Sequence, residues 1–142
     1  MESLDMAGHL IRRLHQQSTW VFVQRTQEAG FDLTPVQFAA LDAVHSQPGI
    51  DQARVAEVIA YDRATIGGVI ERLEHKGWLR RVVSERDRRA RELSLTPAGE
   101  RTRAAVLPVV RGLQREILQS LSEADRARFL KLARRAVGAP SV

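Results

Sequence analysis

The sequence contains no cysteine. Structural disulfides, thiolate zinc sites and thiol-based redox sensing are therefore excluded, and the composition fits a reducing compartment. The chain also lacks an apolar run of about 18 residues, the length that indicates a membrane-spanning helix. Its first residues, MESLDMAGH, do not form a signal-peptide pattern. From these absences we expect a soluble, cytoplasmic protein with no membrane partner.

The sequence motifs of common enzyme and metal sites are also missing. There is no Gly-x-Ser-x-Gly nucleophile turn, no phosphate-binding loop and no dinucleotide fingerprint. His9 and His15 are six residues apart, which is not the i, i+4 spacing that two metal ligands on one helical face prefer. His45 and His75 have no evident ligand partners in the sequence. We therefore expect no enzyme activity, no cofactor and no bound metal.

The chain does carry an excess of basic charge. Its 22 Lys and Arg residues against 17 acidic residues give a formal net charge of +5, and the sequence pI is about 10.9. A basic balance is compatible with nucleic-acid binding but is weak evidence until the charge is located. The length of 142 residues suits one domain or two lobes, and the hydrophobic fraction of 44% is ordinary for a globular protein.

The segment 62–76, DRATIGGVIERLEHK, has the pattern of an amphipathic helix. Its apolar residues recur at i, i+3, i+4 and i+7, and so share one face: Ile66, Val69, Ile70 and Leu73. Asp62 is the predicted N-cap, and Gly77 is placed to end the helix in a left-handed turn. The other face carries Ala64, Thr65, Gly68, Glu71, Arg72 and His75. Because Gly67 and Gly68 each cost roughly 1 kcal/mol of helix propensity, we infer a smooth face built for the close approach of a partner. The basic surroundings suggest that this partner is DNA.

Apolar spacing and capping residues predict five further helices. The first spans 4–29 and ends at Gly30, and its apolar surface, which includes Trp20 and Val23, extends over more than one side. The second spans 35–47 and is predicted to bury Phe38, Leu41 and Val44. A short helix at 52–60 should bury Val55, Val58 and Ile59, and with the turn at 60–61 and the helix 62–76 it makes a helix-turn-helix. The last two start at Pro97 and after Ser122, and Pro108 should kink the first of them.

A β-hairpin is predicted directly after the helix-turn-helix. Residues 78–84 read as a strand, 84–91 as a charged turn and 92–95 as the returning strand. Six arginines make this the densest basic cluster of the chain: Arg80, Arg81, Arg86, Arg88, Arg89 and Arg91. The predicted fold is therefore mainly α with a small β-wing. We expect a winged helix-turn-helix lobe at 34–96 and a helical dimerisation lobe formed by 1–33 and 97–142.

Two stretches make the chain resemble the MarR family (multiple antibiotic resistance regulators) of bacterial transcription factors. They are DRRARELSLTPAG at 87–99 and VAEVIAYDRATIGGVIERLEHKGWLRR at 55–81, and the family pattern covers nearly the whole chain. The resemblance implies a homodimer formed by the first, fifth and sixth helices, with the helix 62–76 in the major groove of DNA. It also implies that Arg89 enters the minor groove and that Asp87 orients it.

A narrower likeness involves DLTPVQFAAL at 32–41 and DQARVAEVIAYDRATIGGVIERLE at 51–74. These stretches look like regulators that control the breakdown of small aromatic or heteroaromatic carboxylates, such as benzoate, hydroxycinnamate or nicotinate derivatives. Ligands of the family lie between the two lobes, so the resemblance implies a site drawn from His9, Arg12, His15, Trp20 and Phe38. Arg12 could receive a carboxylate, and Phe38 or Trp20 could stack on a ring. Alternatively, Phe38 belongs to the core, Trp20 to the dimer interface and His15 to a structural contact.

The predicted DNA contacts fall into two groups. On the helix-turn-helix, Arg63 is assigned to phosphate and Thr65 and Arg72 to base edges, while Ala64 and Gly68 meet thymine methyl groups or make room. On the wing the predicted contacts are Arg86, Asp87, Arg88 and Arg89.

These contacts give the hypothesis of a homodimeric regulator, a repressor, on a roughly palindromic operator with half-sites about 10 bp apart. A small aromatic carboxylate effector would release it. The alternatives are an architectural DNA-binding protein without an effector and a winged-helix protein–protein interaction module. The arginine-rich wing argues against the protein–protein module.

Overall fold

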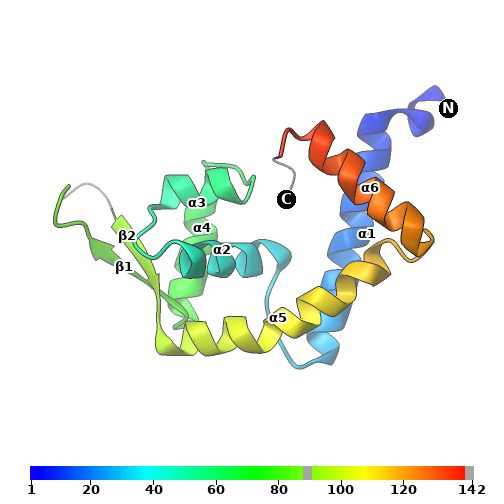
Figure 1. Ribbon diagram of the computed structural model, residues 1–142. Helices are drawn as coiled ribbons and strands as arrows, with labels where there is room; N and C mark the ends of the chain where they lie inside the picture. Colours follow the sequence, from blue (N-terminus) through cyan, green and yellow to red (C-terminus); the bar gives the residue numbers. More distant parts are fainter. Residues whose placement is uncertain (88–90, 140–142) are drawn as a thin grey trace. The chain divides into compact units, whose positions relative to one another are not determined.

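The computed structural model describes residues 1–87 and 91–139. A 3-10 turn (Glu2–Asp5) precedes the elements α1 (Ala7–Glu28), α2 (Pro35–Ser46), α3 (Gln52–Val58), α4 (Ile66–His75), β1 (Leu79–Val83), β2 (Arg91–Leu95), α5 (Pro97–Ile117) and α6 (Glu123–Ala136), shown in Figure 1. The predicted fold, mainly α with a small β-wing, is confirmed. None of the described helices is both long enough and apolar enough to cross a membrane.

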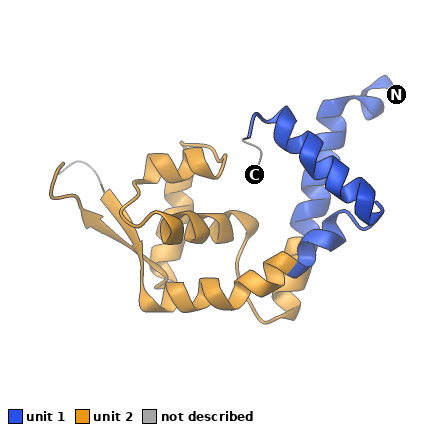
Figure 2. Cartoon of the chain, viewed as in Figure 1, with its two compact units in different colours: residues 1–21, 112–142 blue, residues 22–111 orange. Residues whose placement is uncertain are grey.

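The chain divides into two compact units, which Figure 2 shows in different colours. The winged unit comprises Phe22–Arg111, and the helical unit comprises Met1–Val21 and Gly112–Val142. The sequence-based division assigned 22–33 and 97–111 to the helical lobe, whereas these segments cluster with the winged unit. One contact that holds them there joins the rings of Phe22 and Phe38, whose centroids are 6.4 Å apart. The continuous helix α5 therefore runs from the winged unit into the helical unit at residues 111–112.

The core of the winged unit contains the apolar face predicted for the segment 62–76. Ile66, Val69, Ile70 and Leu73 are between 0 and 9% exposed, which confirms that face. Leu41 and Val44 of α2 are fully buried, as predicted, but Phe38 is only half-buried. Val58 was predicted to be buried and is instead 43% exposed, because α3 ends at that residue and leaves it at the edge of the packed face.

Three predicted helix starts are confirmed by side-chain caps. Thr34 and Gln37 form a capping box, in which Thr34 Oγ1 accepts from the Gln37 N–H at 3.2 Å and Gln37 Oε1 accepts from the Thr34 N–H at 3.1 Å. Asp51 accepts from the Arg54 N–H at 2.8 Å at the start of α3. Ser122 accepts from the Asp125 N–H at 3.1 Å at the start of α6. These caps satisfy backbone donors that the first helical turn leaves without partners.

The start predicted for the helix 62–76, which is the second helix of the helix-turn-helix and is called the recognition helix below, is wrong. Asp62 is not the N-cap of α4, which begins at Ile66 with Thr65 at the capping position and no side-chain cap. Asp62 instead closes the turn before the helix, since its carbonyl accepts from the Thr65 N–H at 3.1 Å and the Ile66 N–H at 3.0 Å. Its carboxylate accepts from the Ala64 N–H and the Thr65 hydroxyl. Arg63, Ala64 and Thr65 therefore lie in this turn and not on the helix.

The predicted wing is a two-stranded antiparallel hairpin that gains a third short segment. Leu79 lies opposite Leu95 and Val83 opposite Arg91. The segment before α3 adds to β2, because the Gly49 N–H donates to the Leu93 carbonyl and the Leu93 N–H donates to the Ile50 carbonyl, both at 2.9 Å. This pairing, which the sequence did not indicate, fixes the base of the wing to the start of the helix-turn-helix.

The Leu-Thr-x-x-Gly part of the wing motif forms a tight joint between α4, β1 and α5. The Thr96 hydroxyl donates to the Gly77 carbonyl at 2.6 Å and accepts from the Gly99 N–H at 3.0 Å. Gly77 has a φ of +77°, which confirms the predicted left-handed end of the helix. A Cβ at Gly99 would lie 1.9 Å from the Trp78 carbonyl oxygen. Only glycine fits there without displacing the backbone of the wing.

Candidate DNA-binding surface

The outward side of α4 and the turn before it form a continuous exposed surface. It contains the residues predicted to contact DNA, and Arg63, Ala64, Thr65, Gly68 and Arg72 are all exposed. The turn is held by Asp62, so Ala64 and Thr65 are presented on fixed backbone. Glu71 and His75 extend the same exposed face toward the end of α4. We call the five predicted residues together the α4 surface.

Gly68 has no structural reason within the winged unit to be glycine. Nothing lies within 4 Å of a Cβ built at this position, and its φ is not positive. Gly67, its neighbour, differs because an added Cβ would lie 3.3 Å from the Gln52 amide nitrogen. A glycine in the first turn of a helix costs about 0.5 to 1 kcal/mol of helix propensity relative to alanine. The absence of a side chain at Gly68 is therefore better explained by a binding partner that approaches the helix backbone closely.

The cations around the α4 surface differ in how far the fold already engages them. Arg72 and Arg63 take part in no ion pair within residues 1–87 and 91–139. Arg81 is engaged, because its Nε lies 2.6 Å from Glu74 Oε1 and its Nη1 lies 3.5 Å from Gln52 Oε1. Arg72 and Arg63 are thus free to meet phosphate or base edges, whereas Arg81 joins β1 to α4 and α3.

Just after β1, Ser84 holds the backbone that leads into the turn of the wing. This residue is buried, and its hydroxyl oxygen accepts from the N–H groups of Arg86 and Asp87 at 3.2 and 3.4 Å. The side chains of Arg86 and Asp87 are exposed. Arg88 and Arg89 lie outside the described residues. The minor-groove contact of Arg89, and its orientation by Asp87, therefore stay predictions.

One residue that supports the surface could not be found from the sequence. Lys76 caps the end of α4, and its ammonium group donates to the Asp32 carbonyl and lies 3.4 Å from Gln37 Oε1. It also lies 4.7 Å from the centroid of the Trp78 ring, a cation–π arrangement. Lys76 therefore ties the end of the recognition helix to the beginning of α2. Its two oxygen partners, on Asp32 and Gln37, are about 40 residues away in sequence, beyond the reach of any local pattern.

The residues predicted to bind a small ligand are divided between the two units. His9, Arg12, His15 and Trp20 belong to the helical unit, and Phe38 belongs to the winged unit. His15 lines an apolar groove of about 770 Å³ formed by α1, α5 and α6. Phe38 lines a smaller groove of about 340 Å³ between α2 and α3. The assembly of these five residues into one pocket stays a prediction.

No described part of the chain presents a metal site. Among residues 1–87 and 91–139 there is no group of three or more His, Cys, Asp or Glu side chains that could hold a metal ion. The α4 surface presents exposed cations, a hydroxyl group and small side chains, which are groups suited to binding a partner.

Comparisons with known proteins agree with this geometry. The sequence profile described as MarR family matches residues 31–90. The transcriptional regulator HosA of Escherichia coli is 34% identical over 131 residues, which cover 92% of this chain and 94% of HosA.

Two solved structures are also similar over almost their whole length. BpsR of Bordetella bronchiseptica, whose DNA binding is regulated by 6-hydroxynicotinic acid, superposes with a TM-score of 0.86 at 30% identity, covering 96% of each chain. The transcriptional repressor CouR, bound to a 23-mer DNA duplex, superposes with a TM-score of 0.81 at 26% identity, covering 96% of this chain and 95% of CouR.

Proposed function

The chain belongs to the MarR family of transcriptional regulators, and from this premise we propose that it is a homodimeric repressor released from its operator by a small aromatic carboxylate. The operator is roughly palindromic, with one half-site for each subunit. The effector acts by binding more tightly to a dimer geometry in which the two α4 helices no longer fit successive grooves. A ligand can shift the protein in this way only through such a difference in affinity.

The observation that carries the DNA-binding part is the α4 surface itself. The small residues of this surface are exposed, and the fold itself does not require a glycine at position 68. The cations Arg63 and Arg72 lie beside these small residues and are free to contact DNA. Small side chains allow the helix backbone to approach base pairs, and arginines supply phosphate and base-edge contacts. The similar repressor CouR, which has a structure on duplex DNA, supports the same reading.

Exposed apolar side chains in the helical unit support the homodimer. Trp20 is 64% exposed, and several large apolar residues of the same unit are also exposed, namely Leu4, Met6, Leu10, Ile11, Leu130, Leu132 and Val137. A monomer rarely leaves so many such side chains in water within one compact unit. We expect a solution mass of twice the chain mass of 15.9 kDa, and we expect Leu132→Asp to shift the protein toward the monomer in light scattering.

The class of effector is supported by chemistry and by similarity. Arg12 and His15 offer cationic or hydrogen-bonding groups for a carboxylate, and Phe38 and Trp20 offer aromatic faces. BpsR, whose DNA binding is regulated by a heteroaromatic carboxylate, is similar over 96% of its chain. The proposal assigns these residues to one effector site.

The experiment that tests the proposal measures DNA binding directly. An operator is selected from the DNA flanking the gene, and its affinity is measured by fluorescence anisotropy against non-specific competitor across a range of salt concentrations. The titration is repeated with benzoate, 4-hydroxybenzoate, hydroxycinnamates and 6-hydroxynicotinate. We expect specific binding with a steep salt dependence and a loss of affinity with one of these carboxylates.

The possible outcomes separate the parts of the proposal. Specific binding that no carboxylate weakens would refute the effector class and leave the DNA-binding regulator. Binding without sequence preference would favour an architectural protein. Absence of DNA binding with and without the carboxylates would refute the repressor and direct the search to a protein partner.

A further inference from the structure

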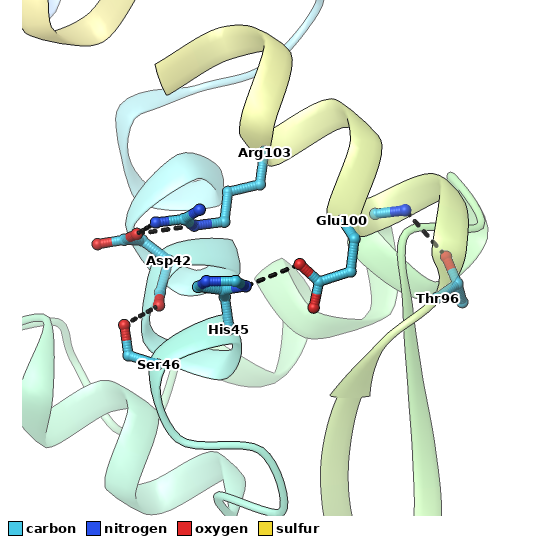
Figure 3. Close-up of polar contacts among 7 residues, drawn as sticks. Asp42, His45, Ser46, Thr96, Glu100 and Arg103 are labelled. Atoms are coloured by element: carbon cyan, nitrogen blue, oxygen red, sulfur yellow. Dashed lines mark hydrogen bonds and ion pairs between the residues drawn. The ribbon is translucent and has the colours of Figure 1, made fainter. Parts of the chain in front are cut away.

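Two polar links join α2 to the first half of α5 within the winged unit (Figure 3). Asp42 Oδ1 accepts two hydrogen bonds from Arg103, from Nε at 2.9 Å and from Nη2 at 2.7 Å. One turn further along α2, His45 Nδ1 lies 2.7 Å from Glu100 Oε2. We call these four residues the α2–α5 clamp. The later residue of α2 meets the earlier residue of α5, so the two helices run in opposite directions where they are linked.

The geometry of the clamp is that of an orienting contact. The Arg103 side chain is only 16% exposed, and two of its nitrogens converge on a single carboxylate oxygen of Asp42. Charge-assisted bonds from a planar guanidinium constrain direction as well as distance. The second link, one helical turn away, resists rotation about the first. The stronger Arg103–Asp42 link and the half-exposed His45–Glu100 link together constrain both the separation and the angle of α2 and α5.

The clamp connects α5 to α2, and α2 in turn packs against the recognition helix α4. Helix α2 packs against both α3 and α4, and its residues Leu41 and Val44 are fully buried in the core that also contains α4. Helix α5 is continuous through Arg111 and Gly112, where the winged unit gives way to the helical unit. A change in the angle between α2 and α5 would thus turn α4 relative to the helix that leads to the proposed dimer interface.

We propose that the α2–α5 clamp is a positioning device that sets the spacing between the two operator half-sites. Asp42 and Arg103 act through the orientation of α4 and do not touch DNA. The inference rests on the proposed homodimeric DNA binding, because spacing has meaning only when two recognition helices bind one duplex. Half-sites of such dimers lie about one helical turn of DNA apart, so a small rotation of α4 removes one subunit from its groove.

The test compares duplexes that differ only in half-site spacing. It uses the selected operator, versions with one or two base pairs inserted or removed between the half-sites, and a duplex with a single half-site. The variants are Asp42→Asn, Arg103→Met and the exchanged pair Asp42→Arg with Arg103→Asp. Arg128→Met is the matched control, because it removes the same charge and an ion pair confined to α6. Circular dichroism and thermal unfolding verify that each variant is folded.

We expect Asp42→Asn and Arg103→Met each to lower affinity for the selected operator by about tenfold, within the range of coupling measured for contacting pairs. Their affinity for the single half-site should stay within about twofold of wild type, and their dependence on spacing should become flatter. The exchanged pair should recover both properties, and Arg128→Met should match wild type.

Three results would overturn the proposal. One is unchanged operator affinity and spacing dependence in both single variants. Another is a loss on the single half-site equal to the loss on the full operator, which would indicate general damage to the winged unit. The third is a wild-type protein that binds the half-site and the full operator alike, which would refute the dimeric reading along with the clamp. The first of these results, obtained while the wild type prefers the full operator to the single half-site, would refute the clamp and leave the dimeric reading intact.

Discussion

Replacement of Gly68 by alanine should stabilise the protein and weaken its binding to DNA. The position lies in the first turn of α4, is exposed, and has nothing within 4 Å of an added Cβ. Alanine removes the entropic cost of a helical glycine, which near a helix end is about 0.5 to 1 kcal/mol. For a protein of this size that gain corresponds to a rise in Tm of about 2 to 4 °C.

The same methyl group should obstruct the operator. A Cβ at Gly68 projects from the α4 surface between Thr65 and Arg72, where the proposed DNA would lie. If the helix is in contact with base edges there, it must retreat or tilt, and contacts worth about 1 to 3 kcal/mol per base pair weaken. We therefore expect operator affinity to fall by at least about tenfold, since both subunits of the dimer carry the change.

Thermal unfolding followed by circular dichroism and operator binding followed by anisotropy measure the two effects separately. Gly112→Ala is the matched control, because Gly112 is also helical and exposed with open space around its Cβ. That variant should gain similar stability and keep operator affinity. If Gly68→Ala binds the operator as tightly as wild type, the α4 surface does not approach DNA closely at this residue. If the variant is less stable than wild type, the glycine has an intramolecular role and the reasoning fails.

Three further predictions test the joints around this surface. Gly99→Ala should lower the free energy of unfolding by at least about 2 kcal/mol, because its Cβ would lie 1.9 Å from the Trp78 carbonyl oxygen; unchanged urea unfolding would contradict this. Ala60→Gly should raise the Tm, since Ala60 has a φ of +56° and a left-handed conformation costs a side-chain-bearing residue about 1 kcal/mol; a lower Tm would show that chain entropy dominates. Arg86→Ala should reduce the slope of log K against log salt concentration by about one, measured on a duplex with a single half-site, because the arginine would neutralise one phosphate there. An unchanged slope would show that Arg86 does not contact the DNA backbone.

The sequence predicted those features that depend on neighbours along the chain. The buried face of α4 follows from apolar residues at helical spacing, and Ile66, Val69, Ile70 and Leu73 are buried as expected. The capping box at Thr34 is a three-residue pattern with a direct structural meaning. The wing followed from alternation and a charged turn. In each case the residues that decide the structure lie within one or two turns of one another.

The errors have a common physical origin. An aspartate that caps a helix and one that closes a preceding turn both accept bonds from N–H groups two or three residues later, so Asp62 has the same local pattern in either role. Val58 has the right spacing for burial, but the end of α3 depends on the turn at Ala60 and not on periodicity. The pairing of Gly49 and Ile50 with Leu93 joins segments more than 40 residues apart.

Local sequence patterns identify the residues of the proposed DNA-binding surface, whereas contacts between distant residues set the orientation of that surface. The α4 surface is defined by which side chains are small or charged on the outward side of α4 and in the turn before it, so its residues can be read from sequence. Its direction is fixed by Lys76, which reaches Asp32, and by Arg103, which reaches Asp42 61 residues earlier. Changes on the surface should therefore alter affinity for a single half-site, whereas changes at the distant contacts should alter tolerance of half-site spacing. Two regulators with identical recognition helices could thus prefer operators that differ only in the distance between their half-sites.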